Sequence, residues 1–129
     1  MKFLQKKIKT IVEKTNTGFS AFAEDYPVFT TGKTLTELTG NMVEALNLFY
    51  EDRHLKVSIK NIDLEIDFKQ FFLYYRVLNA KFLAERIGIH PTLLSQYIQG
   101  RKKPSAQQTE KIISGIQEIG RELSELNLT

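Results

Sequence analysis

The sequence predicts a mixed α+β fold in two modules, a strand-rich module over residues 1–66 and an all-helical module over residues 67–129. Two observations predict this division. In the first module apolar residues alternate with polar ones, as in strands that bury one face. From Asp67 onward apolar residues recur every three or four positions, as in amphipathic helices. The length of 129 residues is sufficient for one domain or two very small ones.

Three strands are predicted at the start of the first module. The residues expected on the buried face of the first strand occupy even positions: Leu4, Ile8, Thr10 and Val12. Asn16-Thr17-Gly18 is a turn signal, and residues 19–23 alternate as a second strand. After the break at Asp25-Tyr26-Pro27, residues 28–31 form a short third strand that Gly32 ends.

One helix and a further strand region follow. Thr34 begins a Thr-x-x-Glu capping box, which predicts a helix that ends near residues 50–52. Its apolar stripe comprises Leu35, Leu38, Met42, Ala45, Leu46 and Phe49. Residues 55–59 then alternate, and residues 62–66 alternate in the opposite phase. Either a hairpin through Lys60-Asn61 or one continuous bulged strand would explain this pattern.

The second module is predicted to contain four helices. The first begins at residue 68 and carries an aromatic stripe at helical spacing: Phe68, Phe71, Phe72 and Tyr75. The second covers residues 80–87, the third starts at Pro91, and a long fourth follows Ser105. The residues that begin or end these helices have the expected capping types: Asp67, Asn79, Gly88, Pro91, Gly100 and Ser105.

The net charge of +3 is unevenly distributed. Residues 1–66 carry nine basic and nine acidic side chains, whereas residues 67–129 carry nine and six. Residues 69–111 contain eight basic side chains and only two acidic ones, Glu85 and Glu110. This balance predicts a polyanionic partner for the second module.

Residues 80–99 fit the pattern of a helix-turn-helix. Ala84 is the small contact residue, Gly88 allows the turn, and the apolar set is Leu83, Ile87, Ile89, Leu94 and Tyr97. The residues expected to face bases of double-stranded DNA have side chains that can bond base edges: His90, Thr92, Ser95, Gln96 and Gln99. The basic residues of the loop that follows are expected to contact phosphates: Arg101, Lys102 and Lys103.

Residues 67–123 resemble the phage-repressor and Cro class of helix-turn-helix domains. The resemblance is carried by Phe-Leu-Ala-Glu-Arg-Ile-Gly-Ile at residues 82–89, Leu-Ser-Gln-Tyr-Ile at residues 94–98, and Gly-Arg-Lys-Lys-Pro-Ser at residues 100–105. The chain departs from this class at His90-Pro91, where Ser or Thr is more usual. The resemblance implies an operator-binding domain.

Residues 8–52 resemble the HicB antitoxin family, through Gly18-Phe19, the segment of residues 26–34 and the helix of residues 35–52. The resemblance implies a partial RNase H-like βββαβ domain that neutralises a small HicA-type ribonuclease toxin by occlusion, while the second module represses the shared operon. The usual acidic, proline-containing segment is reduced here to residues 24–27. The toxin-binding residues proposed from their aromatic, acid-flanked setting are Tyr26, Pro27, Val28 and Phe29.

The residues do not predict an enzyme, a cofactor or a metal site. The chain has no Cys, and His54 and His90 lack an obvious third ligand. Asp63, Glu65 and Asp67 would line one face of a strand, as a nuclease requires. We favour a polar sheet face instead, on which Lys56 pairs with Glu65.

The last helix carries a heptad seam, which predicts a homodimer or higher homo-oligomer: Ile112, Ile116, Ile119, Leu123 and Leu126. Lysines interrupt the apolar residues of the N-terminal segment, so we expect no signal peptide, no membrane span and a cytoplasmic protein. The alternative function is a stand-alone repressor whose first module senses a ligand or dimerises.

Overall fold

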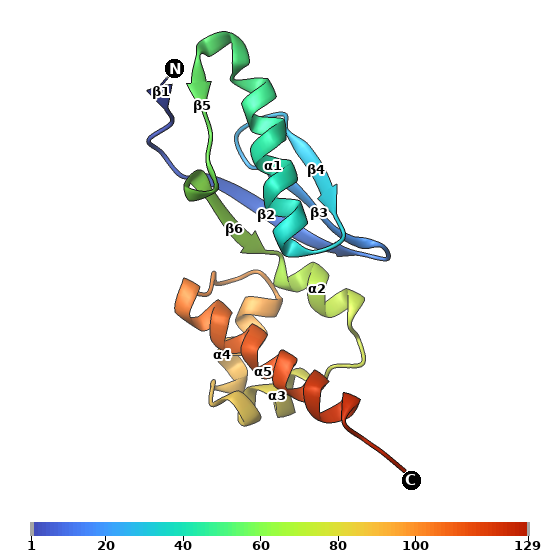
Figure 1. Ribbon diagram of the computed structural model, residues 1–129. Helices are drawn as coiled ribbons and strands as arrows, with labels where there is room; N and C mark the ends of the chain where they lie inside the picture. Colours follow the sequence, from blue (N-terminus) through green and yellow to red (C-terminus); the bar gives the residue numbers. More distant parts are fainter. Residues whose placement is uncertain (1, 129) are drawn as a thin grey trace. The chain divides into compact units, whose positions relative to one another are not determined.

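The computed structural model describes residues 2–128 and has a mixed α+β fold (Figure 1). It divides into two compact units, and the division falls between Tyr74 and Tyr75. The first unit therefore extends past the predicted boundary after Ile66, because helix α2 (Phe68–Tyr74) packs on a strand of that unit. None of the helices in the described part of the chain is long and apolar enough to cross a membrane.

A four-stranded sheet forms the centre of the first unit. Its strands are β2 (Ile8–Thr15), β3 (Gly18–Ala23), β4 (Phe29–Gly32) and β6 (Ile62–Ile66). The order is β4-β3-β2-β6, in which β2 pairs antiparallel with β3 and parallel with β6. A separate parallel pair joins β1 (Lys2–Phe3) to β5 (Leu55–Lys56). The three predicted strands at the start of this unit are confirmed.

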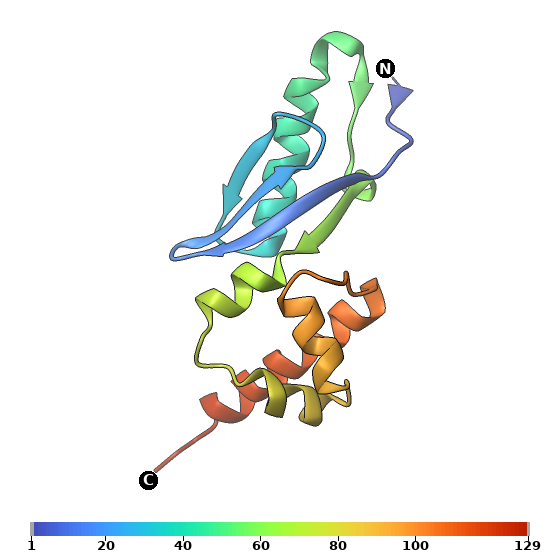
Figure 2. The same ribbon diagram turned by 180° about the vertical axis from the view of Figure 1, so that it is seen from behind.

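Helix α1 (Leu35–Phe49) covers one face of this sheet (Figures 1 and 2). Thr34 is its N-cap, since the Thr34 hydroxyl accepts a 3.1 Å hydrogen bond from the Glu37 N–H. The core between helix and sheet comprises Leu38, Met42 and Leu46 of α1 with Ile8, Val12, Ala21 and Ala23 of the strands. Gly32 allows the close approach of α1, because a Cβ there would lie 2.5 Å from the Leu38 nitrogen.

The segment after α1 is neither the predicted hairpin nor one continuous strand. A 3₁₀ turn at Glu51–Arg53 leads into β5, and a second one at Ile59–Asn61 separates β5 from β6. The buried Asn61 side chain accepts a hydrogen bond from the Ser58 N–H at 2.9 Å. It also donates to the Leu4 and Lys6 carbonyls at 2.9 and 2.8 Å. Ile59, an apolar residue of the alternating segment 55–59, is 67% exposed as a result of this turn.

Helix α2 is tied to β2 by a pair of side chain to backbone hydrogen bonds. The Gln70 amide donates to the Lys14 carbonyl at 2.7 Å and accepts from the Lys14 N–H at 2.8 Å. Asp67 caps the helix as predicted, since its carboxylate accepts from the Gln70 N–H at 3.1 Å. Of the predicted aromatic stripe, Phe68 and Phe72 are buried. These contacts place the helix in the first unit.

The second unit contains three helices among its described residues: α3 (Ala80–Ile87), α4 (Pro91–Ile98) and α5 (Ala106–Ser124). Their starts are the predicted ones. Asn79 accepts from the Phe82 N–H and Ser105 from the Gln108 N–H, both at 3.1 Å. Pro91 occupies the first turn of α4, where its missing N–H leaves no hydrogen bond unmade.

Candidate nucleic-acid interface

Three residues connect α3 to α4, and the local sequence determines their conformation. Gly88 adopts a left-handed backbone with φ of 76°, and the Ile89 N–H donates to the Ala84 carbonyl at 3.0 Å. These features end α3 in the way that glycine commonly ends helices. His90 then caps α4, because its Nδ1 accepts from the Thr92 N–H at 3.2 Å. The two helices are thus joined by a tight turn.

The apolar residues predicted to hold the two helices together are inside the unit. Four of the predicted positions and one on α5 are buried: Leu83, Ile89, Leu94, Tyr97 and Ile112. Ala84 is fully buried as well, in agreement with its predicted role as a small contact residue. Ile87 is only half-buried. Because α3 packs on both α4 and α5 around this core, the remaining face of α4 is presented on a rigid support.

Gly115 is a structural residue that the sequence analysis missed. A Cβ at Gly115 would overlap Cγ2 of Ile87, so the absence of a side chain lets α5 lie close to α3. The only signal in the sequence is that a glycine falls between two apolar positions, Ile112 and Ile116, of a long helix. Gly120, on the same helix, has open space around it.

Gly115 and Gly120 form a matched pair for a stability experiment. We expect Gly115→Ala to lower the free energy of unfolding of the second unit by ~1–3 kcal/mol, because overpacking forces the helices apart. Gly120→Ala should raise it by ~0.5–1 kcal/mol, since alanine favours the helix and meets nothing. Urea unfolding followed by circular dichroism at 222 nm measures both. Equal effects of the two substitutions would contradict the close packing at Gly115.

The outward face of α4 carries the predicted base-reading side chains. Thr92, Ser95 and Gln99 are exposed at helical spacing, and Gln96 is half-buried beside them. The Gln99 amide donates to the Ser95 hydroxyl at 3.3 Å. His90 is exposed at the start of the helix, with one ring nitrogen used for capping. The structure therefore brings all five residues to one side of α4 or to its first turn.

The basic loop is held at the C-terminal end of α4. Gly100 has φ of 76°, its N–H donates to the Tyr97 carbonyl at 3.1 Å, and the Arg101 N–H donates to the Gln96 carbonyl at 2.9 Å. This pair of hydrogen bonds is the Schellman motif of helix ends. The side chains of Arg101, Lys102 and Lys103 are exposed. Three cations are therefore positioned one turn beyond the polar face of α4.

The positive charge of the chain belongs to the second unit. Residues 75–129 carry eight basic and five acidic side chains, and residues 1–74 carry ten of each. Between residues 87 and 109 there is no acidic side chain. Arg86, which counted toward the predicted basic region, instead forms ion pairs with Glu118 at 3.8 Å and with Glu122 on α5. These ion pairs connect α3 to α5.

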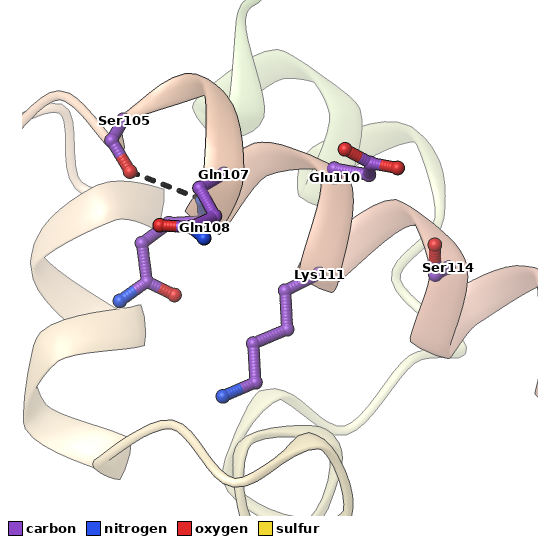
Figure 3. Close-up of a pocket in the computed structure, with 6 residues that line it drawn as sticks. All are labelled: Ser105, Gln107, Gln108, Glu110, Lys111 and Ser114. Carbon is purple, nitrogen blue, oxygen red and sulfur yellow. Dashed lines mark hydrogen bonds between the residues drawn. The ribbon is translucent and has the colours of Figure 1, made fainter.

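A shallow hollow of about 490 Å³ lies along the first half of α5 (Figure 3). Polar side chains line it: Ser105, Gln107, Gln108, Glu110, Lys111 and Ser114. Lys111 extends from α5 toward the turn, and its Nζ lies 3.7 Å from the position that a Cβ on Gly88 would take. Another cation is therefore placed beside the connection between α3 and α4.

Two of the four residues that the sequence predicts to bind a toxin, Tyr26 and Val28, are not exposed in the structure. Val28 is buried, so it is not part of any surface. Tyr26 is half-buried, and its ring meets those of Phe49 and Tyr50 edge to face at 5.5 and 5.7 Å. Burial among these rings raises the pKa of Tyr50 to about 12. Of the predicted four-residue segment only Pro27 and Phe29 are exposed, because Val28, directly before β4, is part of the core and Tyr26 packs against that core.

The acidic residues near β6 are arranged as a charged sheet face. Glu65 and Glu24 both pair with Lys9, at 3.7 and 3.5 Å. The predicted partner Lys56 lies elsewhere, with its ammonium group 5.7 Å from the ring of Phe3. Within residues 2–128, no group of three or more His, Asp or Glu side chains is arranged to hold a metal ion.

Comparisons of the chain with protein-family models, with curated proteins and with solved structures found no match. Its function is therefore inferred from the residues and their geometry.

Proposed function

We propose that the chain binds DNA through its second unit, which acts as a helix-turn-helix domain similar to those of phage repressors and Cro. The observation that carries the proposal is the polar, acid-free face of α4 followed by three exposed cations. Hydroxyl and amide side chains bond base edges, whereas cations bind phosphates. Both kinds of group occur here on one rigid support.

Within this proposal the protein is a HicB-type antitoxin of the cytoplasm that represses its own operon. The first unit is a partial RNase H-like domain that occludes a small HicA-type ribonuclease toxin. Two observations support the assignment of toxin binding to the first unit and DNA binding to the second. The four-stranded sheet and its helix follow the order β2, β3, β4, α1, β6 along the chain, which is the order that the HicB resemblance implies, and the short pair β1–β5 is additional. The first unit has no net charge, so only the second is suited to a polyanion.

The proposed repressor is a homodimer, because two-fold operators require two reading heads about 34 Å apart. Apolar side chains near the end of α5 and at the start of α3 are exposed in the single chain: Leu123, Leu126 and Phe82. Ile116 and Ile119, earlier in the heptad seam, are half-buried within the unit. Helix α5 ends at Ser124, so Leu126 lies beyond the helix and is not part of the predicted seam. The exposed apolar side chains around the end of α5 support a contact between two copies.

The division between base-reading and phosphate-binding side chains can be tested with Gln96→Ala and Lys102→Gln. Gln96→Ala should cost ~1–3 kcal/mol of binding to the operator and leave binding to scrambled DNA unchanged. Lys102→Gln should weaken binding to both and lower the slope of log K against log salt by about 1. Fluorescence anisotropy with a duplex that precedes the chain's own gene, and with its scrambled version, measures these effects. Identical behaviour of the two variants would contradict the assignment.

A further inference from the structure

The face of the four-stranded sheet opposite α1 carries a row of apolar side chains. In Figure 2 the strands lie in front of α1, and no other element of residues 2–74 covers them. Phe29 and Phe22 are direct cross-strand partners, and Phe22 is in turn the partner of Ile11. Phe29 is 65% exposed and Phe22 is 40% exposed. Two neighbouring aromatic rings in water are typical of a surface that binds another macromolecule.

Acidic side chains surround this row. Glu65 is the β6 partner of Ile11, and Lys9 lies between Glu65 and Glu24. Strand alternation places further carboxylates on the same face. We define the open sheet face as the row with its charged neighbours: Ile11, Phe22, Phe29, Lys9, Glu13, Glu24, Asp63 and Glu65. Within this set four carboxylates accompany one ammonium group.

We infer that the open sheet face binds the RNA-binding surface of the ribonuclease toxin, an inference that rests on the proposed antitoxin function. A ribonuclease binds its polyanionic substrate through a basic surface. The carboxylates of the open sheet face complement such a surface and steer it into contact, while Phe22 and Phe29 bury apolar area once contact is made. Because the toxin surface that is covered is the one that holds RNA, binding and inhibition are the same event.

The charge of the open sheet face also selects against other occupants. The open sheet face has four carboxylates and one ammonium group, so its net charge is negative and it repels nucleic acid. A second copy of the chain would bring an identical acidic face against the first, which like charges disfavour. A basic protein partner is the occupant that satisfies both the apolar row and its acidic surroundings.

The test uses the full chain and, as the probe, the product of the small gene adjacent to its own. The surface variant is Phe22→Ser/Phe29→Ser. The matched control is Leu48→Ser, which removes a side chain that is 68% exposed on α1, at the other side of the same unit. Isothermal titration calorimetry measures binding, and cleavage of RNA by the probe measures inhibition. We expect the double variant to bind at least about 100-fold more weakly and the control to bind within about 3-fold of the wild type.

A charge-reversal variant, Glu24→Lys/Glu65→Lys, keeps the test informative if the aromatic substitutions disturb the fold. It should weaken binding to the probe and remove much of its dependence on salt. Circular dichroism of each variant and its binding to DNA through the second unit establish that the chain is folded.

Each outcome has a separate meaning. If the wild-type chain neither binds nor inhibits the probe, the proposed antitoxin function is wrong and the inference fails with it. If the wild type inhibits and both surface variants do so equally well, the antitoxin function stands and the open sheet face is not its site. Loss of binding in Leu48→Ser alone would assign the site to α1. Self-association of the wild type that the Phe22→Ser/Phe29→Ser variant abolishes would make the face a contact between copies and overturn the inference.

Discussion

Replacement of Arg101, Lys102 and Lys103 together by glutamine is expected to weaken binding to any DNA duplex by about 100- to 1,000-fold at 0.1 M salt. The slope of log K against log salt should fall by about 2.7, since each phosphate contact contributes about 0.9. The three cations project from the end of α4 and contribute little to the core of the unit, so the fold should be unchanged. Fluorescence anisotropy across a salt series measures both effects.

The matched control removes the same total charge from the first unit. Lys2, Lys33 and Lys69 are exposed there, and their joint replacement by glutamine should change the salt slope by less than about 1. If the control weakens binding as much as the loop variant does, DNA is held by net charge rather than by the basic loop beside α4.

Asn61→Ala is expected to destabilise the first unit by about 3–5 kcal/mol, the largest stability effect that we predict for a single side chain. The substitution removes the partners of the Leu4 and Lys6 carbonyls and of the Ser58 N–H in a site that is 5% exposed. A buried polar group without a partner costs about 1–3 kcal/mol. Hydrogen exchange of β2 and β6 in the full chain measures the loss as a fall in the free energy of opening.

Asn41 provides the control for this experiment. Its amide donates a single hydrogen bond, of 2.8 Å, to the Thr31 carbonyl at an exposed site. Asn41→Ala should cost no more than about 1 kcal/mol, because water replaces the lost partner. A comparable loss in the two variants would show that Asn61 does not hold the turn before β6.

The starts of the three helices of the second unit were predictable from the sequence almost to the residue. Asn79, Gly88, Pro91, Gly100 and Ser105 act on backbone groups within a few positions of themselves, so their effect is visible in a short window of sequence. The start of α1 at Thr34 follows from the same kind of local signal. The positions at which helices begin were therefore the feature of the fold that the sequence predicted most accurately.

The errors in the first unit have a common physical cause, which is hydrogen bonding between residues distant in sequence. Asn61 bonds carbonyls that precede it by 57 and 55 positions, which alternation within residues 55–66 cannot reveal. Gln70 likewise bonds Lys14, 56 positions earlier, and so attaches α2 to the sheet. The boundary between the units follows from this contact rather than from the change of period at Asp67.

The candidate sites were predictable to different degrees. Helical spacing predicts exposure of the polar residues of α4, and the structure exposes all of them except Gln96, which is half-buried; the cations of the basic loop are exposed as well. The ion pairs of Arg86, one of the eight basic residues counted between residues 69 and 111, could not be predicted because its partners Glu118 and Glu122 lie on another helix. Val28 was misassigned because four consecutive residues were placed on one surface, whereas neighbours in an extended segment such as Val28 and Phe29 face opposite sides.

The most direct measurement of DNA reading by α4 is selection of the full chain's preferred duplexes from a random library, followed by sequencing. We expect enrichment of a motif with two inverted half-sites whose centres lie about 10 base pairs, or a multiple of that spacing, apart. The same selection with Ser95→Ala/Gln96→Ala should change the motif at the base pairs that α4 contacts. Recovery of no motif, or of an unchanged motif with the variant, would contradict sequence recognition by α4.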